Sequence, residues 1–210
     1  MIFWIIPILW VTAYVYFYIK AKCDDPAMTR VMIVLGSGNV YLYFMLGGHT
    51  AEMLSYTSVL ACKYQPRLYV IAATDSMSEQ KVLDLENKCA TKFNIKRIPR
   101  AREVKQSYAS SIFSTLVSCL FAFPIVTIFR AKLILCNGPG TCIPICFVAI
   151  LLHILRIHST LIIFVESICR TKTLSLSGKI LYYTRLVDVI VQWPELKTKY
   201  PRSIYLGLLS

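Results

Sequence analysis

Residues 33–50 read IVLGSGNVYLYFMLGGHT, and this stretch decides the fold. Its first six residues are typical of a buried strand that ends in a glycine turn. Residues 47–50 are typical of a glycine turn that begins a helix. Between the two turns lies an apolar run, residues 39–46, with no turn residue after Asn39. The stretch therefore predicts a strand–turn–helix unit of a parallel α/β sheet, with an interruption inside its turn.

From about residue 30 onward, short β-branched runs alternate with longer helical patterns. Strands are expected, in chain order, within residues 30–36, 67–75, 92–100, 133–138, 160–167, 187–193 and 203–207. Helices are expected between them, among others at residues 50–61 and 76–89, the latter with Ser76 or Ser78 as its N-cap. Apolar strands that alternate with helices indicate a parallel sheet covered on both faces. We therefore predict a doubly wound, Rossmann-like α/β domain over residues 30–210.

The composition is both basic and apolar. The chain has 23 Lys and Arg against 11 Asp and Glu, a formal charge of +12, and 56% hydrophobic residues. A basic protein this apolar works more often at an anionic membrane or on an anionic lipid than on nucleic acid. We therefore expect membrane lipid, and no nucleic acid, among its partners.

The first residues of the chain predict a membrane anchor. Residues 2–19 contain no charge and are followed by Lys20 and Lys22. At about 1.5 Å per residue they nearly span a hydrocarbon core of about 30 Å. A signal peptide would need a basic segment before this run and a small-x-small cleavage site after it, and both are missing. We therefore predict one transmembrane helix, residues 1–22, with the rest of the chain on the cytoplasmic side.

Ligands of such a sheet bind beyond the carboxyl ends of the strands. The residues that follow the expected strands are Gly36, Ser37, Gly47, Gly48, His49, Thr50, Arg97, Arg100, Arg102, Asn137, Gly138, Gly140, Thr141 and Glu166. Glycine turns that open helices present N–H groups to an anion, and arginines add charge-assisted hydrogen bonds. The pattern predicts a ligand that carries phosphate or pyrophosphate. Plainer alternatives remain open, because the glycines could form simple tight turns, the arginines a solvated face, and Glu166 a helix cap.

No motif predicts a cofactor or a metal. The segment GSGNVY lacks the third glycine of the dinucleotide-binding pattern, and the sequence has no GxxxxGK[ST] phosphate loop and no CxxC pair. His153 and His158 flank an apolar helical pattern, where structural or surface roles are more common than ligation. We therefore expect no cofactor and no metal site.

Six long and idiosyncratic segments carry a family resemblance. They are GGHTAEML (47–54), AATDSMS (72–78), RIPRAREVKQS (97–107), LILCNGPGTCIPIC (133–146), VESICRTKTLSLSGKILY (165–182) and VQWPELKTKYPRSIYLG (191–207). With them, the chain resembles the asparagine-linked glycosylation protein 14 family from about Arg30 to its end. The resemblance implies the acceptor-side half of a GT-B glycosyltransferase, anchored in the endoplasmic reticulum membrane with its domain on the cytosolic face.

The resemblance also implies a reaction and a partner. A soluble catalytic subunit of the asparagine-linked glycosylation protein 13 family would supply the sugar-nucleotide half. Together the two subunits would transfer N-acetylglucosamine (GlcNAc) from its UDP donor to dolichyl-diphosphate-GlcNAc, so that this chain would be inactive alone. A pure membrane scaffold, with no residue in the chemistry, is the alternative. An autonomous glycosyltransferase is disfavoured because the second half of a GT-B enzyme is missing.

Residue roles follow from the resemblance together with side-chain chemistry. His49, at a helix N-terminus, is the candidate base, or else only a ligand of the diphosphate, and Glu166 is a second catalytic candidate. The expected diphosphate ligands are Gly36, Ser37, Gly47, Gly48, Thr50, Arg97, Arg100 and Arg102. The residues expected at the interdomain cleft are Asn137, Gly138, Gly140 and Thr141. Those expected to grip the partner are Tyr205, Leu206, Leu208 and Leu209.

The family loop reads G-S-G-G-H-T, whereas residues 38–46 separate Ser37 from Gly47 here. They are either a genuine insertion, forming a lid or a membrane-dipping loop, or a very short intron retained in frame. Codons available for the two ends match intron boundaries and favour the intron, which sequencing of transcripts across residues 35–50 would decide.

Residues 112–129 form a second uncharged stretch. For it we predict a covering helix whose apolar side touches lipid, with an ordinary core helix as the alternative.

Overall fold

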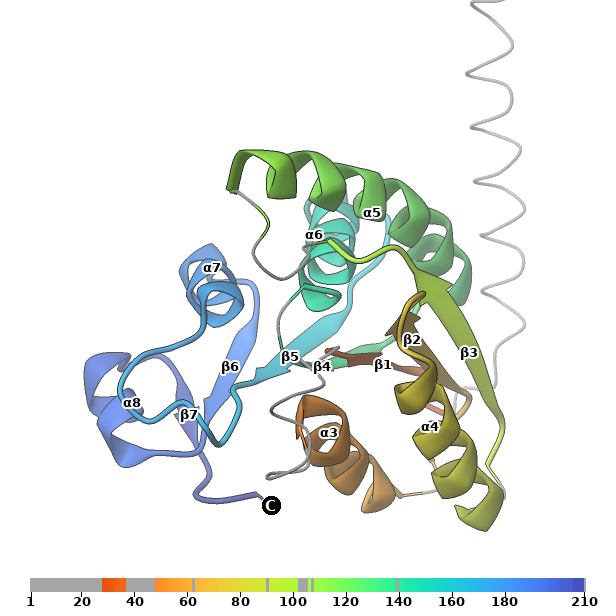
Figure 1. Ribbon diagram of the computed structural model, residues 1–210, viewed down its shortest axis with the longest axis horizontal. Coiled ribbons are helices and arrows are strands. Elements are labelled where there is room, and N and C mark those ends of the chain that lie inside the picture. Colours follow the sequence, from red (N-terminus) through yellow and green to blue (C-terminus); the bar gives the residue numbers. More distant parts are fainter. Residues whose placement is uncertain are drawn as a thin grey trace, which may run out of the picture.

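The computed structural model describes residues 28–36, 48–61, 63–89, 91–101, 106, 108–138 and 140–209. The predicted anchor at residues 1–22 and the interrupting segment 38–46 lie outside this part of the chain, as do Ser37, Gly47 and Arg102. The described residues form a seven-stranded sheet between two layers of helices (Figure 1). The parallel α/β architecture predicted from the sequence is confirmed.

All seven expected strands are present. They are β1 (Val31–Leu35), β2 (Arg67–Ala72), β3 (Phe93–Ile98), β4 (Leu133–Asn137), β5 (Leu161–Val165), β6 (Asp188–Val191) and β7 (Ile204–Tyr205). Their order is β3-β2-β1-β4-β5-β6-β7, and every neighbouring pair is parallel. Strand β7 is shorter than predicted, because the chain adopts a φ of +78° at Gly207 and leaves the extended conformation.

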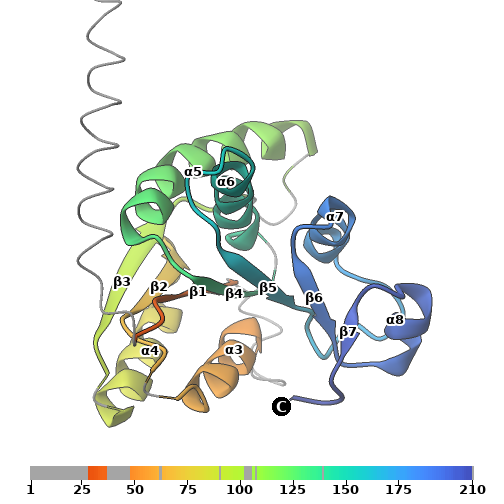
Figure 2. The same cartoon turned by 180° about the vertical axis from the view of Figure 1, so that it is seen from behind.

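The helices lie on both faces of the sheet. They are α3 (Gly48–Ser58), α4 (Ser76–Cys89), α5 (Tyr108–Phe129), α6 (Cys142–Ile154), α7 (Leu176–Thr184) and α8 (Pro194–Lys199). Helices α5 and α6 cover one face, and α3 and α4 cover the other, as the two opposite views show (Figures 1 and 2). Successive residues of a strand point to opposite faces, so Met32 and Val34 belong to the core under α5 and α6, and Ile33 belongs to the other core.

Helix α4 begins where the sequence predicts, but with a different cap. The side chain of Asp75 accepts hydrogen bonds from the backbone N–H of Ser78 at 3.0 Å and from the Ser78 hydroxyl at 2.7 Å. The N-cap is therefore Asp75, and the choice of Ser76 or Ser78 was wrong. A carboxylate is at least as good a cap as a hydroxyl, because it accepts from the helix and favours the positive end of its dipole.

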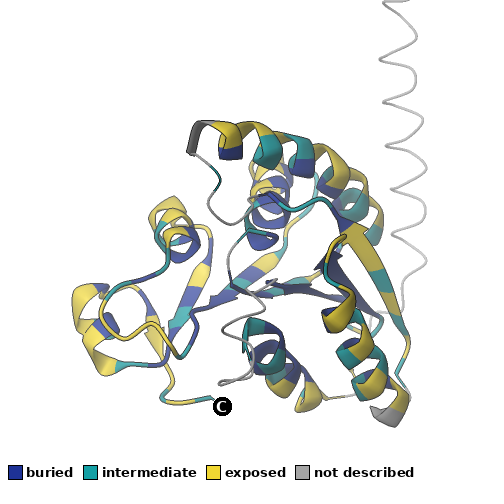
Figure 3. Cartoon of the chain, viewed as in Figure 1, coloured by how far each residue is buried: buried dark blue, intermediate teal, exposed yellow. Residues whose placement is uncertain are grey.

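Helix α5 exposes much of its apolar surface. Residues 110–129 have a mean hydropathy of 2.2, and only 17% of the most apolar window is buried. Among the described residues it is the one helix long and apolar enough to cross a membrane. Figure 3 shows exposed residues along this helix, and they include Phe113 and Leu120 at 72% and 74% exposure. The predicted covering helix is confirmed, while its contact with lipid stays a prediction.

Candidate functional site

The site lies where the chain order of the strands reverses. Strands β1 and β4 are neighbours, yet α3 follows β1 onto one face of the sheet and α6 follows β4 onto the other. Open α/β sheets bind their ligands at such a switch point, beyond the carboxyl ends of the two strands, and we call this edge of β1 and β4 the crevice. Gly36 follows β1, Gly138 follows β4, and the strand register pairs Leu35 with Asn137 at this edge. The crevice therefore brings together residues that the sequence places on different turns.

A chain of hydrogen bonds crosses the crevice. Nδ1 of His49, in the first turn of α3, lies 3.0 Å from Oδ1 of Asn137 at the end of β4. Nδ2 of Asn137 donates to Oε2 of Glu52 at 2.8 Å, and the hydroxyl of Ser167 donates to Oε1 of Glu52 at 3.0 Å. Asn137, Glu52 and Ser167 are buried, while His49 is half-buried. The ends of two strands, β4 and β5, and helix α3 are thereby linked in a single polar network.

This network determines which ring nitrogen of His49 is available. A carboxylate only accepts hydrogen bonds, so Glu52 requires the NH₂ group of Asn137 on its side. The amide oxygen of Asn137 must then face His49, and it accepts the proton of Nδ1. In the neutral imidazole the other nitrogen, Nε2, consequently carries the lone pair. Glu52 therefore sets the tautomer of His49 through Asn137.

Burial adjusts the protonation of His49. Desolvation lowers its pKa, and the charge of Arg170 lowers it further. The charge of Glu52 and the hydrogen bond to Asn137 act in the opposite direction, but the pKa remains below the ordinary value. The imidazole is therefore neutral around pH 7, the state in which Nε2 can accept a proton.

Glycine is required at residue 36 and at residue 138, where the turns after β1 and β4 meet. A Cβ on Gly138, whose φ is +86°, would lie 2.9 Å from Cγ of His49. A Cβ on Gly36 would lie 2.5 Å from the backbone oxygen of Asn137. The two turns approach each other so closely that any side chain would displace the histidine or the strand end. The close approach of the turns after β1 and β4 therefore requires glycine at both positions, whereas a tight turn alone would require only its backbone conformation.

Sequence reasoning missed part of the network. Glu52 was not selected as a site residue, although its position three residues after His49 places both on one face of α3. Tyr56 and Gln192 were also missed: Nε2 of Gln192 donates to the Tyr56 hydroxyl at 3.2 Å and to the backbone oxygen of Glu166 at 3.0 Å. Burial, with the charge of Glu52 as a second cause, raises the pKa of Tyr56 to about 12, so this phenol stays protonated.

Glu166 is buried but faces the loop before α7. Its Oε2 accepts from the backbone N–H of Ser175 at 2.8 Å and from the Ser175 hydroxyl at 3.0 Å, and Ser175 is the N-cap of α7. Burial is the main effect on this carboxyl and raises its pKa, against the bonds from Ser175. A Cβ on Gly178 would lie 2.4 Å from the same oxygen. These contacts favour the helix-capping alternative, and a catalytic role for Glu166 stays a prediction.

The predicted phosphate ligands have different surroundings. The Thr50 hydroxyl bonds to that of Ser78 at 2.8 Å and so connects α3 to α4. The guanidinium of Arg97 forms an ion pair with Glu79. Arg100 differs, since its Nε is buried and has no hydrogen-bond partner among the described atoms. A buried donor without a partner is costly, so Arg100 is the arginine best suited to receive an anionic ligand.

Polar residues of α5 hold the segment that carries Arg100. The hydroxyl of Ser118 donates to the backbone oxygen of Pro99 at 2.9 Å, and that of Ser114 donates to the backbone oxygen of Ala101 at 2.6 Å. These hydroxyls interrupt the apolar pattern of α5 in the sequence. Their position explains the interruption, because they connect α5 to the loop at the carboxyl end of β3.

The turn after β4 leads into α6. Asn137 and Thr141 are buried, and Gly140 has a φ of +80°. The hydroxyl of Thr141, just before the first turn of α6, has no hydrogen-bond partner among the described residues. The positive end of the α6 dipole therefore lies next to an unused buried hydroxyl, an arrangement that suits an anion.

The C-terminal residues lie close to α3 (Figures 1 and 2). The backbone N–H of Leu209 donates to Oε1 of Gln192 at 3.2 Å, and Gln192 also binds Tyr56 of α3. Tyr205, Leu206 and Leu208 are exposed, and Leu209 is half-buried. The four residues predicted to grip a partner thus form an apolar strip beside the crevice. In the described part of the chain, no group of three His, Cys, Asp or Glu residues could hold a metal ion.

Comparison with solved structures defines the class of the domain. The crystal structure of Acinetobacter baumannii MurG matches with a TM-score of 0.58 over 85% of this chain, at 15% sequence identity. The match covers 45% of the MurG chain, so this chain spans about half the length of that protein. The fold is thus that of one half of a GT-B-type protein.

Sequence comparison identifies the family. The family model described as "Oligosaccharide biosynthesis protein Alg14 like" matches residues 31–209. The UDP-N-acetylglucosamine transferase subunit ALG14 of Rattus norvegicus is 52% identical over 84% of this chain and 81% of its own length. The protein of the same name from Homo sapiens is 49% identical over the same shares, and that of Schizosaccharomyces pombe is 41% identical over 91% and 89%. The chain belongs to the Alg14 family, and the resemblance seen in its sequence is confirmed.

Proposed function

We propose that this chain is the membrane-bound, acceptor-side subunit of a UDP-GlcNAc transferase that acts on dolichyl-diphosphate-GlcNAc. Relatives that carry the transferase-subunit name cover most of the chain, and its fold corresponds to one half of a GT-B-type protein. The observation that carries an active role, beyond a scaffold, is the Glu52–Asn137–His49 network in the switch-point crevice. A scaffold has no need of a buried carboxylate that sets the tautomer of a half-buried histidine.

His49 acts as the general base in this proposal. Its Nε2 takes the proton of the acceptor sugar's attacking hydroxyl while the oxygen of that hydroxyl bonds to the anomeric carbon of the donor. The bond from that carbon to UDP breaks, and UDP leaves with the electron pair. Nδ1 keeps its proton and donates a hydrogen bond to Oδ1 of Asn137, while the charge of Glu52 stabilises the imidazolium that forms.

The diphosphate of the acceptor binds at the rim of the same crevice. The N-terminus of α3, the turn from Gly138 to Thr141 and the unpartnered Nε of Arg100 offer positive charge and hydrogen-bond donors there. Arg100 is two strands away from β1, about 10 Å along the sheet edge, which a diphosphate-linked sugar can bridge. Gly36 and Gly138 allow the two turns and the ring of His49 to approach one another closely at this rim.

Attachment to the membrane places this crevice near its lipid-linked substrate. Residues 2–19 would anchor the chain in the endoplasmic reticulum membrane, and the apolar outer side of α5 would rest on the cytosolic leaflet. The donor half would come from a soluble catalytic subunit of the asparagine-linked glycosylation protein 13 family. That subunit would dock beside the crevice, against the apolar strip of the C-terminal residues.

The test is His49→Gln in the complex of this chain with its catalytic partner, reconstituted with membranes. Glutamine keeps a polar side chain but cannot accept a proton near neutrality. We expect normal assembly and a loss of turnover of about 10²–10⁴-fold, the usual contribution of a general base. Full turnover with an unchanged pH profile would exclude the base role. If Asn137→Ala also left turnover unchanged, the pure scaffold would be the better description.

A further inference from the structure

Helix α3 is bonded to the carboxyl ends of three neighbouring strands, each of which contributes one polar side chain. Asn137 ends β4, Ser167 follows β5, and Gln192 follows β6. Asn137 and Ser167 both donate to Glu52 of α3. Nε2 of Gln192 donates to the hydroxyl of Tyr56, one turn further along the same helix, at 3.2 Å. Gln192 therefore adds the end of β6 to the contacts that hold α3.

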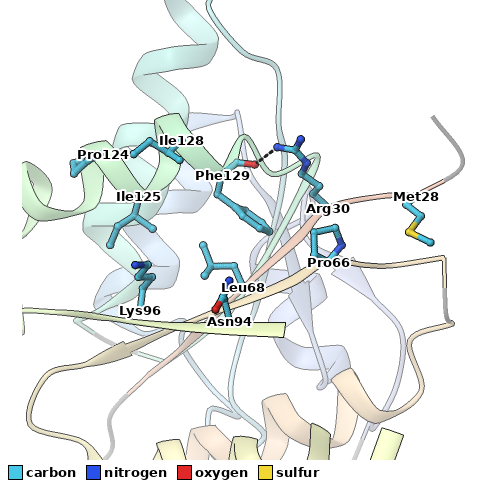
Figure 4. A pocket seen from close by; sticks show the side chains of 10 residues that line it. All are labelled: Met28, Arg30, Pro66, Leu68, Asn94, Lys96, Pro124, Ile125, Ile128 and Phe129. Carbon is cyan, nitrogen blue, oxygen red and sulfur yellow. Dashed lines mark hydrogen bonds between the residues drawn. The ribbon is translucent and has the colours of Figure 1, made fainter. Parts of the chain in front are cut away.

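The two edges of the sheet hold their helices in different ways. At the amino edge, Ile125 and Phe129 of α5 leave a cavity of about 630 Å³ over Leu68 (Figure 4). At the carboxyl edge, hydrogen bonds join α3 to the strand ends. Apolar contacts are non-directional and tolerate a small shift, whereas a hydrogen bond weakens steeply when its geometry changes. The position of α3, with His49 in its first turn, therefore depends on these polar contacts.

Gln192 also holds the C-terminal tail, by which we mean residues 206–209. Gln192 is 1% exposed, and its Oε1 accepts from the backbone N–H of Leu209 at 3.2 Å. Its Nε2 donates to the backbone oxygen of Glu166 at 3.0 Å as well as to Tyr56. An N–H group only donates and a backbone oxygen only accepts, so both neighbours require the same orientation of this amide. One buried amide thus joins the tail to α3.

The contacts continue along α3 to the candidate base. Tyr56 is four residues after Glu52, close enough that burial and then the charge of Glu52 raise the pKa of this phenol to about 12. Glu52 binds Asn137, whose amide oxygen accepts from Nδ1 of His49. A helix moves as one element, so a shift of α3 at Tyr56 would change the surroundings of His49 as well.

The tail itself is largely exposed. Leu206 and Leu208 are 55% and 59% exposed, so this domain covers little of their apolar surface. The last residues of a chain are poorly fixed unless something ties them down. A catalytic subunit that covers these leucines would therefore also hold the N–H of Leu209 against Gln192.

We propose that Gln192 is a positioning residue that makes the crevice depend on the docked catalytic subunit. Docking fixes the tail, the tail fixes the amide of Gln192, and the amide holds Tyr56 and with it α3. His49 is then correctly placed only when the half that carries the donor sugar is present. The inference rests on the proposed docking at the tail and on the proposed role of His49.

Hydrogen exchange of the full-length chain in detergent micelles, with and without the catalytic subunit, tests this link. In the wild type, we expect docking to slow exchange several-fold in peptides of the tail and of α3. Gln192→Met keeps the length of the side chain but removes its hydrogen bonds, so the tail should still be protected and α3 should not. Equal protection of α3 in both proteins would overturn the proposal, because the subunit would then cover α3 directly.

Leu209→Pro tests the same link from the exposed side. Proline removes the N–H that donates to Gln192, at a residue outside the helices and strands. We expect turnover at saturating catalytic subunit to fall about threefold to tenfold, the worth of one neutral hydrogen bond. Leu208→Pro is the control, because the N–H of Leu208 has no acceptor among the described residues, and it should keep wild-type turnover. Equal turnover in the two proline variants would contradict the link.

The combined variant shows whether the two residues act together. Gln192→Met and Leu209→Pro break the same connection, so the double variant should lose no more turnover than Gln192→Met alone. Losses that multiply would mean that the two residues act independently, which would overturn the proposal.

The pH profile separates a displaced α3 from partial unfolding. Desolvation is the main cause that lowers the pKa of His49, and the charges of Glu52 and Arg170 also act on it. A loosened α3 would admit water to the ring, so this pKa should rise toward its ordinary value. The base must be neutral, so the acid limb of turnover should move to higher pH in Gln192→Met and in Leu209→Pro. Partial unfolding would lower turnover without moving the limb, and an unmoved limb would refute the positioning role.

The outcomes distinguish this inference from the proposed function. Protection of the tail without protection of α3 in the wild type would refute the role of Gln192 alone. Full turnover of His49→Gln would refute the base role, while the exchange experiment would still report on the link between tail and helix. If the catalytic subunit protected neither segment, docking at the tail and this inference would both be refuted.

Discussion

The crevice and the outer side of α5 differ from the usual distribution of residues in opposite ways. In the crevice, polar side chains are buried and hydrogen-bonded to one another, so that Glu52 and Asn137 are almost without contact to water. On α5, large apolar side chains such as Phe113 and Leu120 are open to the outside. A buried polar network is costly unless every member is paired, and exposed apolar surface is costly unless something covers it. Each region departs from the ordinary distribution of residues, and we propose chemistry as the reason at the crevice and membrane contact as the reason on α5.

The comparison predicts that the two regions can be damaged independently. Changes in the crevice should reduce turnover without affecting membrane contact, and changes on α5 should do the reverse. A substitution that affected both equally would show that it had simply unfolded the domain. Each variant below should therefore be checked for thermal unfolding.

After His49→Gln, the largest effect is expected from Gly36→Ala. The new Cβ would lie 2.5 Å from the backbone oxygen of Asn137, a contact that no side-chain rotation can relieve. Asn137 must move, and His49 loses the partner that orients its ring. We expect turnover of the complex to fall about 100-fold, the cost of a shift of about 1 Å in a catalytic group. Wild-type turnover in Gly36→Ala would mean that the crevice is not the site.

The apolar residues at the C-terminus (Tyr205, Leu206, Leu208 and Leu209) are expected to contact a protein partner, whereas those of α5 are expected to contact lipid. A chain that ends at Tyr205 keeps β7 and the buried Ser203 but loses Leu206, Leu208 and Leu209. Burial of one leucine is worth about 1.5–3 kcal/mol, which corresponds to about tenfold to 100-fold in Kd. The loss of all three should therefore weaken partner binding by at least about tenfold. Co-precipitation of the catalytic subunit with the shortened chain measures this. The double change Leu206→Ser and Leu208→Ser should have a similar effect at full length. Undiminished recovery of the partner with both variants would refute the docking role.

A smaller effect with a distinct signature is expected from Glu52→Gln. Glutamine can still accept from Asn137, but the charge that stabilises the imidazolium is lost. Hydrogen bonds to charged groups are worth roughly 1.5–3 kcal/mol, so we expect at least a tenfold loss of turnover.

The pH profile provides the signature of Glu52→Gln. The base must be neutral, so turnover falls as the pH decreases through the pKa of His49. The charge of Glu52 raises this pKa, and its removal lowers it, so the acid limb of the profile should move to lower pH. Glu195→Gln on α8 removes a charge outside the network and should leave the limb in place. An acid limb that did not move in Glu52→Gln would contradict the coupling.

The smallest effect is expected on α5. Phe113 and Leu120 make few contacts within the domain, so Phe113→Glu and Leu120→Glu should change the free energy of unfolding by no more than about 0.5 kcal/mol. Labelling of the α5 peptide by a membrane-soluble photoprobe should nevertheless decrease several-fold, while turnover of the detergent-solubilised complex stays the same. Met77→Glu, on exposed α4, is the control and should change neither. Label confined to residues 1–20 in the wild type would show that α5 does not touch lipid.

Local sequence patterns were sufficient for the elements and for the edge of the sheet that carries the site. The seven strands and the start of α4 followed from apolar runs and turn residues, because periodicity and turn chemistry act between near neighbours. His49 followed in the same way, since a glycine turn into a helix places it at the carboxyl edge. The N-cap of α4 was misassigned because several residues within one turn can cap a helix, and geometry selects among them.

The function of each site residue depended on contacts that no local pattern contains. Glu52 and Asn137 are 85 residues apart in the sequence, and Glu52 and Ser167 are 115 apart, yet one network joins them. Only the strand order places β4 beside β1 and β5 beside β4. Only the packing shows that Thr50 and Arg97 have other partners, whereas Arg100 has an unused donor. The sequence by itself determined the elements, the α/β class, the family and the apolar character of α5, because these depend on residue type and spacing. The tertiary structure decided the tautomer of His49, the need for glycine at residues 36 and 138 and the unused donor of Arg100, because each arises between segments that meet only when the chain is folded.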